Sequence, residues 1–217
     1  MEERVLRSKL YVLEPIVRKL PEVEVPKRHI SFKEKFIWSG LALVVFLMMA
    51  QIMLYGIPEG RGLQLGALQF VLASRTGTLM QLGIGPIVTA GIIMQLLVGA
   101  KLINLDLTNP EDRALFTGVQ KILAITVGVV QAAALAFGGV FGPVTMEVAI
   151  FLVVQLTVGV LVVVFLDELV SKYGFGSGIS LFIAGGVAAT VFWQAFNPIR
   201  LYGAVPSFIS ALISGSP

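Results

Sequence analysis

The stretch RTGTLMQLGIGPIVTAGIIMQL, residues 75–96, has the apolar length of a membrane-spanning helix but carries helix-weakening residues toward its N-terminal end. These residues are Gly77, Gly83, Gly85 and Pro86. Because proline cannot donate a backbone hydrogen bond and its ring crowds the preceding turn, we expect Pro86 to kink or loosen the helix. The glycines allow another backbone to come close. Glycine and proline are common in transmembrane helices for packing alone, but their clustering favours a specific role for this break.

The composition of the chain is that of a polytopic membrane protein. Of its 217 residues, 56% are hydrophobic and 13% are charged, with a mean hydropathy of +0.89, well above the values of soluble domains. Five apolar stretches are long enough to cross a bilayer core, which needs about 20 residues. They are residues 36–57, 79–98, 122–141, 148–166 and 179–196. The sequence therefore predicts an all-α bundle of five spans, with the two termini on opposite sides of the membrane.

The basic residues are unevenly distributed between the two sides of this bundle. Of the 16 lysines and arginines, all except Arg61, Arg75 and Arg200 fall on the side of the N-terminus. The positive-inside rule therefore places the N-terminus in the cytosol and Pro217 outside. This asymmetry explains the net charge of +3 without a nucleic-acid partner. The residues before the first span have no uninterrupted apolar core, so they do not resemble a cleavable signal peptide.

Residues 1–35 form a cytosolic segment in this prediction. Apolar residues repeat at intervals of three and four from Leu6 to Leu20, and basic residues lie off that stripe. The pattern predicts an amphipathic helix on the membrane surface, with its basic residues attracted to anionic lipid. A solvated helix that packs on its own protein fits nearly as well. Ser31 and Glu34 then have capping-box spacing at the start of the first span.

An apolar piece too short to cross the membrane lies between the first two spans. As a helix, residues 63–73 would reach only about 16 Å, and both ends of the piece must lie outside. It can lie on the outer surface, or dip into a protein-lined cavity where its free backbone groups meet protein or water. The glycines around it, at positions 60, 62, 66 and 77, suit a mobile segment with a hinge at each end and favour the dipping arrangement.

The sequence offers little for catalysis. Cysteine is absent, and the only histidine, His29, lies in the basic segment, where we expect a solvated side chain. The glycines at positions 174, 176 and 178 follow a transmembrane span rather than a strand, which argues against a dinucleotide-binding loop. The spans lack an ionisable residue near mid-membrane, which a proton- or ion-coupled transporter would usually have. We therefore expect a passive conduit or a scaffold, with no cofactor and no metal.

Two connections carry local signals of their own. Asn109-Pro110 predicts a turn, and Glu111 and Asp112 place negative charge at the N-terminus of the helix that follows. The third and fourth spans are joined by GGVFGPVT, residues 138–145, which is so short that the two helices must be antiparallel neighbours.

Four motifs, in order and spacing, resemble the N-terminal half of the SecY family, the large subunit of the Sec protein-conducting channel. They are SFKEKFIW (31–38), ASRTGTLMQLGIGPIVTAGIIMQLLVGAK (73–101), PEDRALFTGVQK (110–121) and LDELVSKYGFGSGISLFIA (166–184). The resemblance is closer to archaeal and eukaryotic forms than to bacterial ones. It implies two pseudo-symmetric halves of five helices that close like a clamshell around a polypeptide pore. This chain would supply the first half at 36–198, and 199–217 would belong to the external loop between the halves.

The resemblance gives the short apolar piece a role. Residues 58–74 would be the plug, a half-helix that fills the external funnel of the resting channel, with Arg75 and Gly77 as its hinge to the second span. The apolar plug residues would be Leu63, Leu65, Leu68, Phe70 and Val71.

The resemblance also implies a pore ring. The match at GIGPIVTAG assigns Ile84 and Val88 to it, and the match at SGISLFIA assigns Ile179 and Ile183. Residues four apart lie on one helix face, and a ring of aliphatic groups offers water and ions no polar partner, so it can gate by dewetting. Hydropathy, however, places Ile179 near the cytosolic surface. A water-filled cytosolic funnel would resolve this tension.

The second and third spans resemble the lateral gate, the seam through which signal sequences reach lipid. Thr89 and Gln131 are its polar candidates, where an apolar signal helix would have to break a contact worth about 0.6 kcal/mol. Packing alone explains either residue nearly as well. The implied partners are the C-terminal half, SecE-type and small β/SecG-type subunits, a translocating polypeptide with its signal sequence, a ribosome or motor ATPase, and the lipid of an archaeal-like plasma membrane. A small-solute transporter half and a non-transporting assembly subunit stay open as alternatives.

Overall fold

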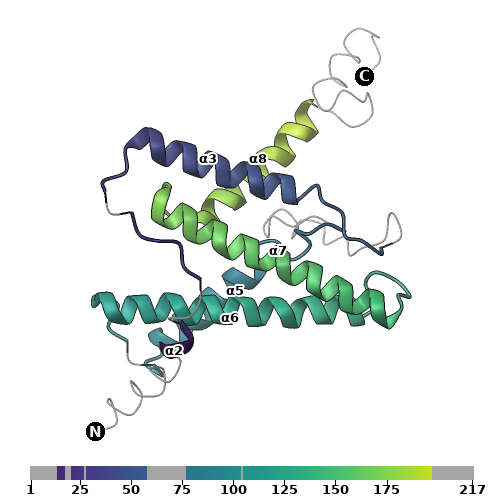
Figure 1. Ribbon diagram of the computed structural model, residues 1–217, viewed down its shortest axis with the longest axis horizontal. Coiled ribbons are helices and arrows are strands. Elements are labelled where there is room, and N and C mark those ends of the chain that lie inside the picture. The colour runs from purple at the N-terminus through teal and green to yellow at the C-terminus, as the bar shows by residue number, and fades with distance from the viewer. Residues whose placement is uncertain (1–13, 18–20, 27, 58–76, 104, 197–217) are drawn as a thin grey trace, which may run out of the picture.

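The computed structural model describes residues 14–17, 21–26, 28–57, 77–103 and 105–196, which form a helical bundle (Figure 1). Its elements are α2 (Glu14–Val17), α3 (Phe32–Met49), α5 (Gly85–Gly99), α6 (Pro110–Phe137), α7 (Met146–Tyr173) and α8 (Gly178–Phe196). Among the described residues, α6 and α7 are long and apolar enough to cross a membrane, and α5 is a shorter apolar helix. The predicted all-α class is confirmed.

The long helices run up and down. Figure 1 shows α7 lying between α3 and α6, and α5 packs on α6 while α8 packs on both α3 and α7. We call the end where α3, α6 and α8 begin and α5 and α7 finish the charged end, on the left of the view. At the opposite end α3 finishes, α5 begins, and α6 turns back into α7. The predicted antiparallel pairing of 122–141 with 148–166 is present as the contact of α6 with α7.

Two helices begin where the sequence predicts. At α3, Glu34 N–H donates to Ser31 Oγ (3.4 Å) and Ser31 N–H donates to the Glu34 carboxylate (3.1 Å), which completes the capping box. At α6, Glu111 N–H donates to the Asn109 side chain (3.1 Å), and Pro110 fills the first helical position. Both caps are set by residues within three positions of one another, which is why they could be read locally.

The second predicted span differs from its expectation. Residues 79–84 form turns, α5 begins only at Gly85, and Pro86 lies in its first turn. The expectation of a helix that covers 79–98 is therefore wrong, and Pro86 begins the helix instead of kinking it. At a first-turn position the missing N–H would have had no helical partner, and the fixed φ of proline suits helix initiation. The weakened stretch thus sets the start of a helix of 15 residues.

The described part of the N-terminal segment packs on its own protein. Val17 of α2 is buried against Leu115 and lies so close to Gly118 of α6 that a Cβ there would collide with it. This agrees, for these residues, with the second of the two arrangements weighed for the segment.

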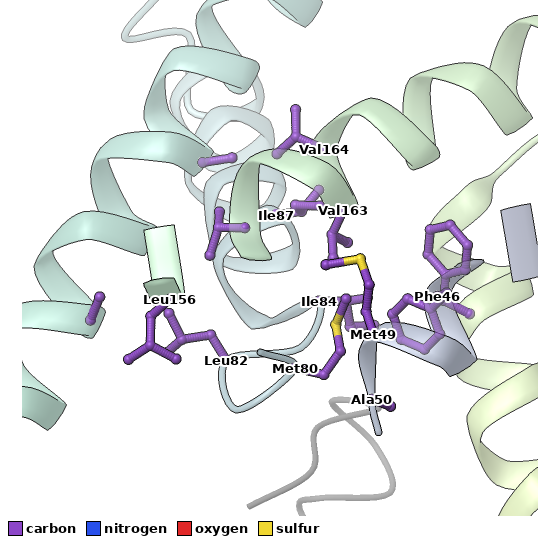
Figure 2. Packing of buried hydrophobic residues seen from close by; sticks show 14 of the residues in the cluster. Phe46, Met49, Ala50, Met80, Leu82, Ile84, Ile87, Leu156, Val163 and Val164 are labelled. Carbon is purple, nitrogen blue, oxygen red and sulfur yellow. The ribbon is translucent and has the colours of Figure 1, made fainter. Parts of the chain in front are cut away.

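The main core lies between α3, α5, α6, α7 and α8 and includes the turns before α5 (Figure 2). Phe46 of α3 stacks on Phe182 of α8 with ring centroids 4.6 Å apart. Glycines allow close approach at several crossings, such as Gly128 of α6 against Val160 of α7.

Candidate functional site

The predicted pore-ring residues lie at the starts of α5 and α8, which share one hydrophobic core. Ile84 is fully buried, and Figure 2 shows it among Phe46, Met49 and Met80. Val88 follows one turn later, and its N–H donates to Ile84 O (3.1 Å). On α8, Ile179 and Ile183 are half-buried against the same cluster. The fold thus brings both predicted pairs to a common core, and their pore role stays a prediction.

The start of α8 is fixed by the end of α7. Ile179 N–H donates to Asp167 Oδ1 (3.0 Å), so this carboxylate of α7 satisfies a free donor at the N-terminus of α8. Gly178 lies so close to Asp167 that a Cβ would meet it at 2.6 Å. These contacts fix the position of Ile179 relative to the end of α7.

Of the predicted plug and its hinge, only Gly77 lies within the described residues; Leu63, Leu65, Leu68, Phe70, Val71 and Arg75 lie outside them. Gly77 has a φ of +73°, a left-handed conformation that favours glycine. Its carbonyl accepts from Leu54 N–H (2.9 Å), and Leu79 N–H donates to Ile52 O (3.0 Å). Residues 52–54 therefore pair with residues 77–79 through backbone hydrogen bonds, around an antiparallel bridge of Met53 with Thr78.

Buried polar side chains shape the turns between this bridge and α5. The Gln81 side chain accepts from Gly77 N–H, and Thr78 Oγ1 accepts from Met80 N–H (3.2 Å). Both residues are buried, so these bonds satisfy backbone donors that a helix would otherwise use. The bond of the Gln81 side chain to Gly77 was not predicted from the sequence.

The predicted lateral-gate residues lie on neighbouring helices. Thr89 of α5 and Gln131 of α6 are both half-buried, and α5 packs on α6. In the same seam Gly91 approaches the Gln120 side chain, where a Cβ would lie 3.2 Å from Nε2. The gate assignment itself stays a prediction.

An ionic cluster that sequence reasoning missed ties the charged end together. Glu168 of α7 accepts from Lys121 of α6 and from Lys172, one turn later on α7, both at 2.7 Å. Lys121 also donates to Pro21 O (2.7 Å) and lies over the Phe165 ring at 4.9 Å. The spacing of Glu168 and Lys172, four residues apart, was the one local signal for it.

The same cluster holds the chain that precedes α3. Val23 N–H donates to Glu168 Oε1 (3.1 Å), and its carbonyl accepts from Lys172 Nζ. The Lys121 side chain is only 9% exposed and that of Glu168 14%, so the charges are satisfied by one another and by backbone rather than by water.

A cavity of about 540 Å³ opens beside this cluster, between α5, α6 and α7. Apolar side chains such as Ile87 and Val164 line it together with polar ones such as Arg113 and Gln120. Within the described residues, no group of three acidic or histidine side chains is arranged to hold a metal ion.

Comparison with known proteins supports the resemblance. A family model described as SecY matches residues 78–215, and one described as the plug domain of Sec61p matches residues 44–77. The protein translocase subunit SecY of Methanocaldococcus jannaschii is 48% identical over 207 residues, covering 94% of this chain and 46% of that protein. The corresponding subunit of Pyrococcus horikoshii is 44% identical over 226 residues, covering 96% and 48%.

Solved structures are similar as well. One described as the structure of a protein conducting channel superposes with a TM-score of 0.81 at 47% identity, covering 94% of this chain and 47% of that one. Sec61 in a canine ribosome-channel complex from the endoplasmic reticulum gives the same TM-score, identity and coverage. The chain spans about half the length of the curated relatives it matches. This chain belongs to the SecY family.

Proposed function

We propose that this chain forms the N-terminal half of a passive protein-conducting channel, through which unfolded polypeptides cross a membrane and apolar segments enter it. The observation that carries the proposal is the pairing of Ile84 with Val88 and of Ile179 with Ile183 at the starts of two helices that share one core. Family membership and the protein conducting channel at 47% identity support it. No cofactor and no catalytic residue has a part in this function.

In the proposed arrangement, five spans built on α3, α5, α6, α7 and α8 cross the membrane, with the charged end in the cytosol and residue 217 outside. Apolar side chains on the outer faces of α3 and α7 support contact with lipid. They include Leu41, Val44, Met48, Ile150, Val154 and Val158, each about half exposed or more. Tags at the two termini should therefore be accessible from opposite sides, and accessibility from one side would show that a span is miscounted.

The structure is consistent with a resting channel. Ile84 is fully buried, so a passing chain reaches it only after its neighbours move. The proposal assigns residues 58–74 to a plug over the funnel and Thr89 and Gln131 to a lateral gate between α5 and α6. Deleting 63–73 should then raise ion leakage without abolishing secretion, and an unchanged single-channel conductance would argue against the plug.

The C-terminal half, a SecE-type clamp and a small β/SecG-type subunit complete the proposed channel, which a ribosome or motor ATPase would supply with substrate. Support for a ribosome comes from the canine Sec61 relative, which was solved in a ribosome-channel complex. This chain would supply only one half of the pore ring. We therefore expect the chain alone to insert in the membrane without conducting protein. Co-expression with the C-terminal half and the smaller subunits should restore translocation.

Photo-crosslinking tests the pore assignment. A photoreactive residue at Ile84, Val88, Ile179 or Ile183 should crosslink to a polypeptide arrested in the assembled channel. Ile150, on the outer face of α7 and 51% exposed, is the matched control and should not. Equal labelling at all five positions would sink the ring assignment, and a solute-transporter half would leave all five unlabelled.

A further inference from the structure

We propose that Gln155 of α7 is a positioning residue. It holds the segment that follows α3, residues 52–57, against α7, and through this segment it fixes the position of Ile84 and the start of α5. The inference rests on the proposed channel function only for the role of Ile84 as a pore-ring residue. Nothing in the sequence motifs singles out Gln155, which lies in a stretch of valine, leucine, isoleucine and phenylalanine.

The Gln155 side chain bonds both backbone groups of Tyr55. Tyr55 N–H donates to Gln155 Oε1 (3.0 Å), and Gln155 Nε2 donates to Tyr55 O (3.3 Å). The amide thus supplies one donor and one acceptor, as a residue of a neighbouring β-strand would. The Tyr55 ring adds an edge contact with Phe151, one turn earlier on α7, at 5.9 Å between centroids.

The two partners need one another for a physical reason. α3 ends at Met49, so residues 52–57 are not helical and lack the internal hydrogen bonds of a helix. Gln155 lies nine residues into α7, about 13 Å along the helix axis, inside the proposed span. In lipid, non-helical backbone is tolerated only where protein or water satisfies it, and a polar side chain there also needs a partner. The Gln155 amide meets both requirements at once.

One helical turn further along α7, Gly159 lies against the segment that leads into α5, at Leu79. The Leu79 carbonyl lies so close to Gly159 that a Cβ would collide with its oxygen. Residues 155 and 159 are four apart and share one helix face. The outgoing chain at Tyr55 and the returning chain at Leu79 therefore rest on the same face of α7, and they are bonded to each other through Leu54, Gly77 and Ile52.

From this seat the chain reaches Ile84 in a few tight turns. Gly83 N–H donates to Met80 O (3.0 Å), and Gly85 N–H donates to Leu82 O (3.1 Å). Because these hydrogen-bonded turns limit how far the backbone can move, a shift of Leu79 relative to α7 also displaces the first residues of α5. Gln155 therefore acts on Ile84 through the backbone.

Amide hydrogen exchange tests the proposal in the protein purified in nanodiscs with the chains that accompany it. We expect Gln155→Leu to speed exchange roughly three- to tenfold at Tyr55, at Leu54 and at Leu79, as losing a membrane hydrogen-bonded pair predicts. The response at Leu79 is decisive, because the Leu79 amide bonds to Ile52 O and not to Gln155, and a purely local role would change exchange at Tyr55 alone.

Two further variants complete the test. Thr157→Val is the matched control on the same helix, because its hydroxyl bonds Val153 O of its own helix (2.7 Å); exchange at Leu79 should stay unchanged. Gln155→Asn keeps an amide that is too short to reach Tyr55, so it should match Gln155→Leu and replaces it if the leucine variant fails to fold. Unchanged exchange at Leu79 in both Gln155 variants would overturn the proposal. Failure of the unaltered protein to translocate would instead count against the channel function alone.

Discussion

The two ends of the bundle solve the same structural problem with different chemistry. At each end, α7 receives a non-helical stretch whose backbone needs partners. At the charged end Glu168 and two lysines bind the chain at Pro21 and Val23, whereas at the opposite end the neutral amide of Gln155 binds Tyr55. In the proposed membrane, Lys121 and Glu168 fall just outside the predicted spans 122–141 and 148–166, whereas Gln155 falls inside the second of them, where a charge would be far more costly.

This difference predicts unequal sensitivity. Removing one member of a buried ionic cluster leaves an uncompensated charge, whereas removing a neutral amide leaves only an unsatisfied polar group. At the charged end, substitutions in the buried cluster should therefore lower stability more than loss of the Gln155 amide does. Substitutions in exposed ion pairs should have little effect on stability.

The largest effect is expected from Glu168→Leu, which breaks the charged end. Lys121 and Lys172 would lose their shared counter-charge, and we expect a loss of about 3 kcal/mol, seen as a lower unfolding midpoint. Glu147→Gln removes an exposed acid in the first turn of α7 and is the control; it should cost less than about 1 kcal/mol, through the lost interaction with the helix dipole. If the two variants behave alike, the cluster does not stabilise this end.

Gly159→Ala should break the opposite end by steric means. The new methyl group would push the Leu79 carbonyl away from α7, at an expected cost of about 1 to 3 kcal/mol. Gly40→Ala is the matched control, because nothing lies within 4 Å of a Cβ there, and its higher helix propensity should stabilise α3 by up to about 1 kcal/mol. Equal destabilisation by both changes would contradict the close contact.

Pro86→Ala tests whether Pro86 begins α5 or kinks a longer helix. Because Pro86 lies in the first turn of α5, its replacement should change stability by less than about 1 kcal/mol. A proline at Ile92, exposed in the interior of α5, should cost about 3 kcal/mol or more. Thermal unfolding of the two variants measures the difference, and a large effect of Pro86→Ala would favour the kink predicted from sequence.

The smallest effect is expected from Arg28→Ala. Arg28 pairs with Glu34 at 2.8 Å, but its side chain is 80% exposed. Such pairs contribute about 0.2 to 1 kcal/mol, and high salt should remove even that difference. A loss as large as that of Glu168→Leu would show that burial does not set the strength of pairs at the charged end.

The sequence by itself determined what depends on neighbours along the chain. Apolar length and composition predicted the all-α class. The capping box of Ser31 and the turn at Asn109-Pro110 were predicted from residues within three positions of one another, and four motifs indicated the family. The spacing of Ile84 with Val88 and of Ile179 with Ile183 placed each pair on one helix face.

The tertiary structure decided what depends on residues far apart. Gln155 meets Tyr55 across 100 positions and Lys121 meets Glu168 across 47, and no periodicity within either segment encodes these pairs. Pro86 illustrates the same limit: a proline that follows two glycines fits a kink or a start, and the pairing of Leu54 with Gly77 and the seat of Leu79 on Gly159 hold residues 77–84 outside a helix. Local sequence sets which conformations a segment can adopt, and long-range packing selects one of them, because only the folded bundle supplies the partners that the free backbone groups require.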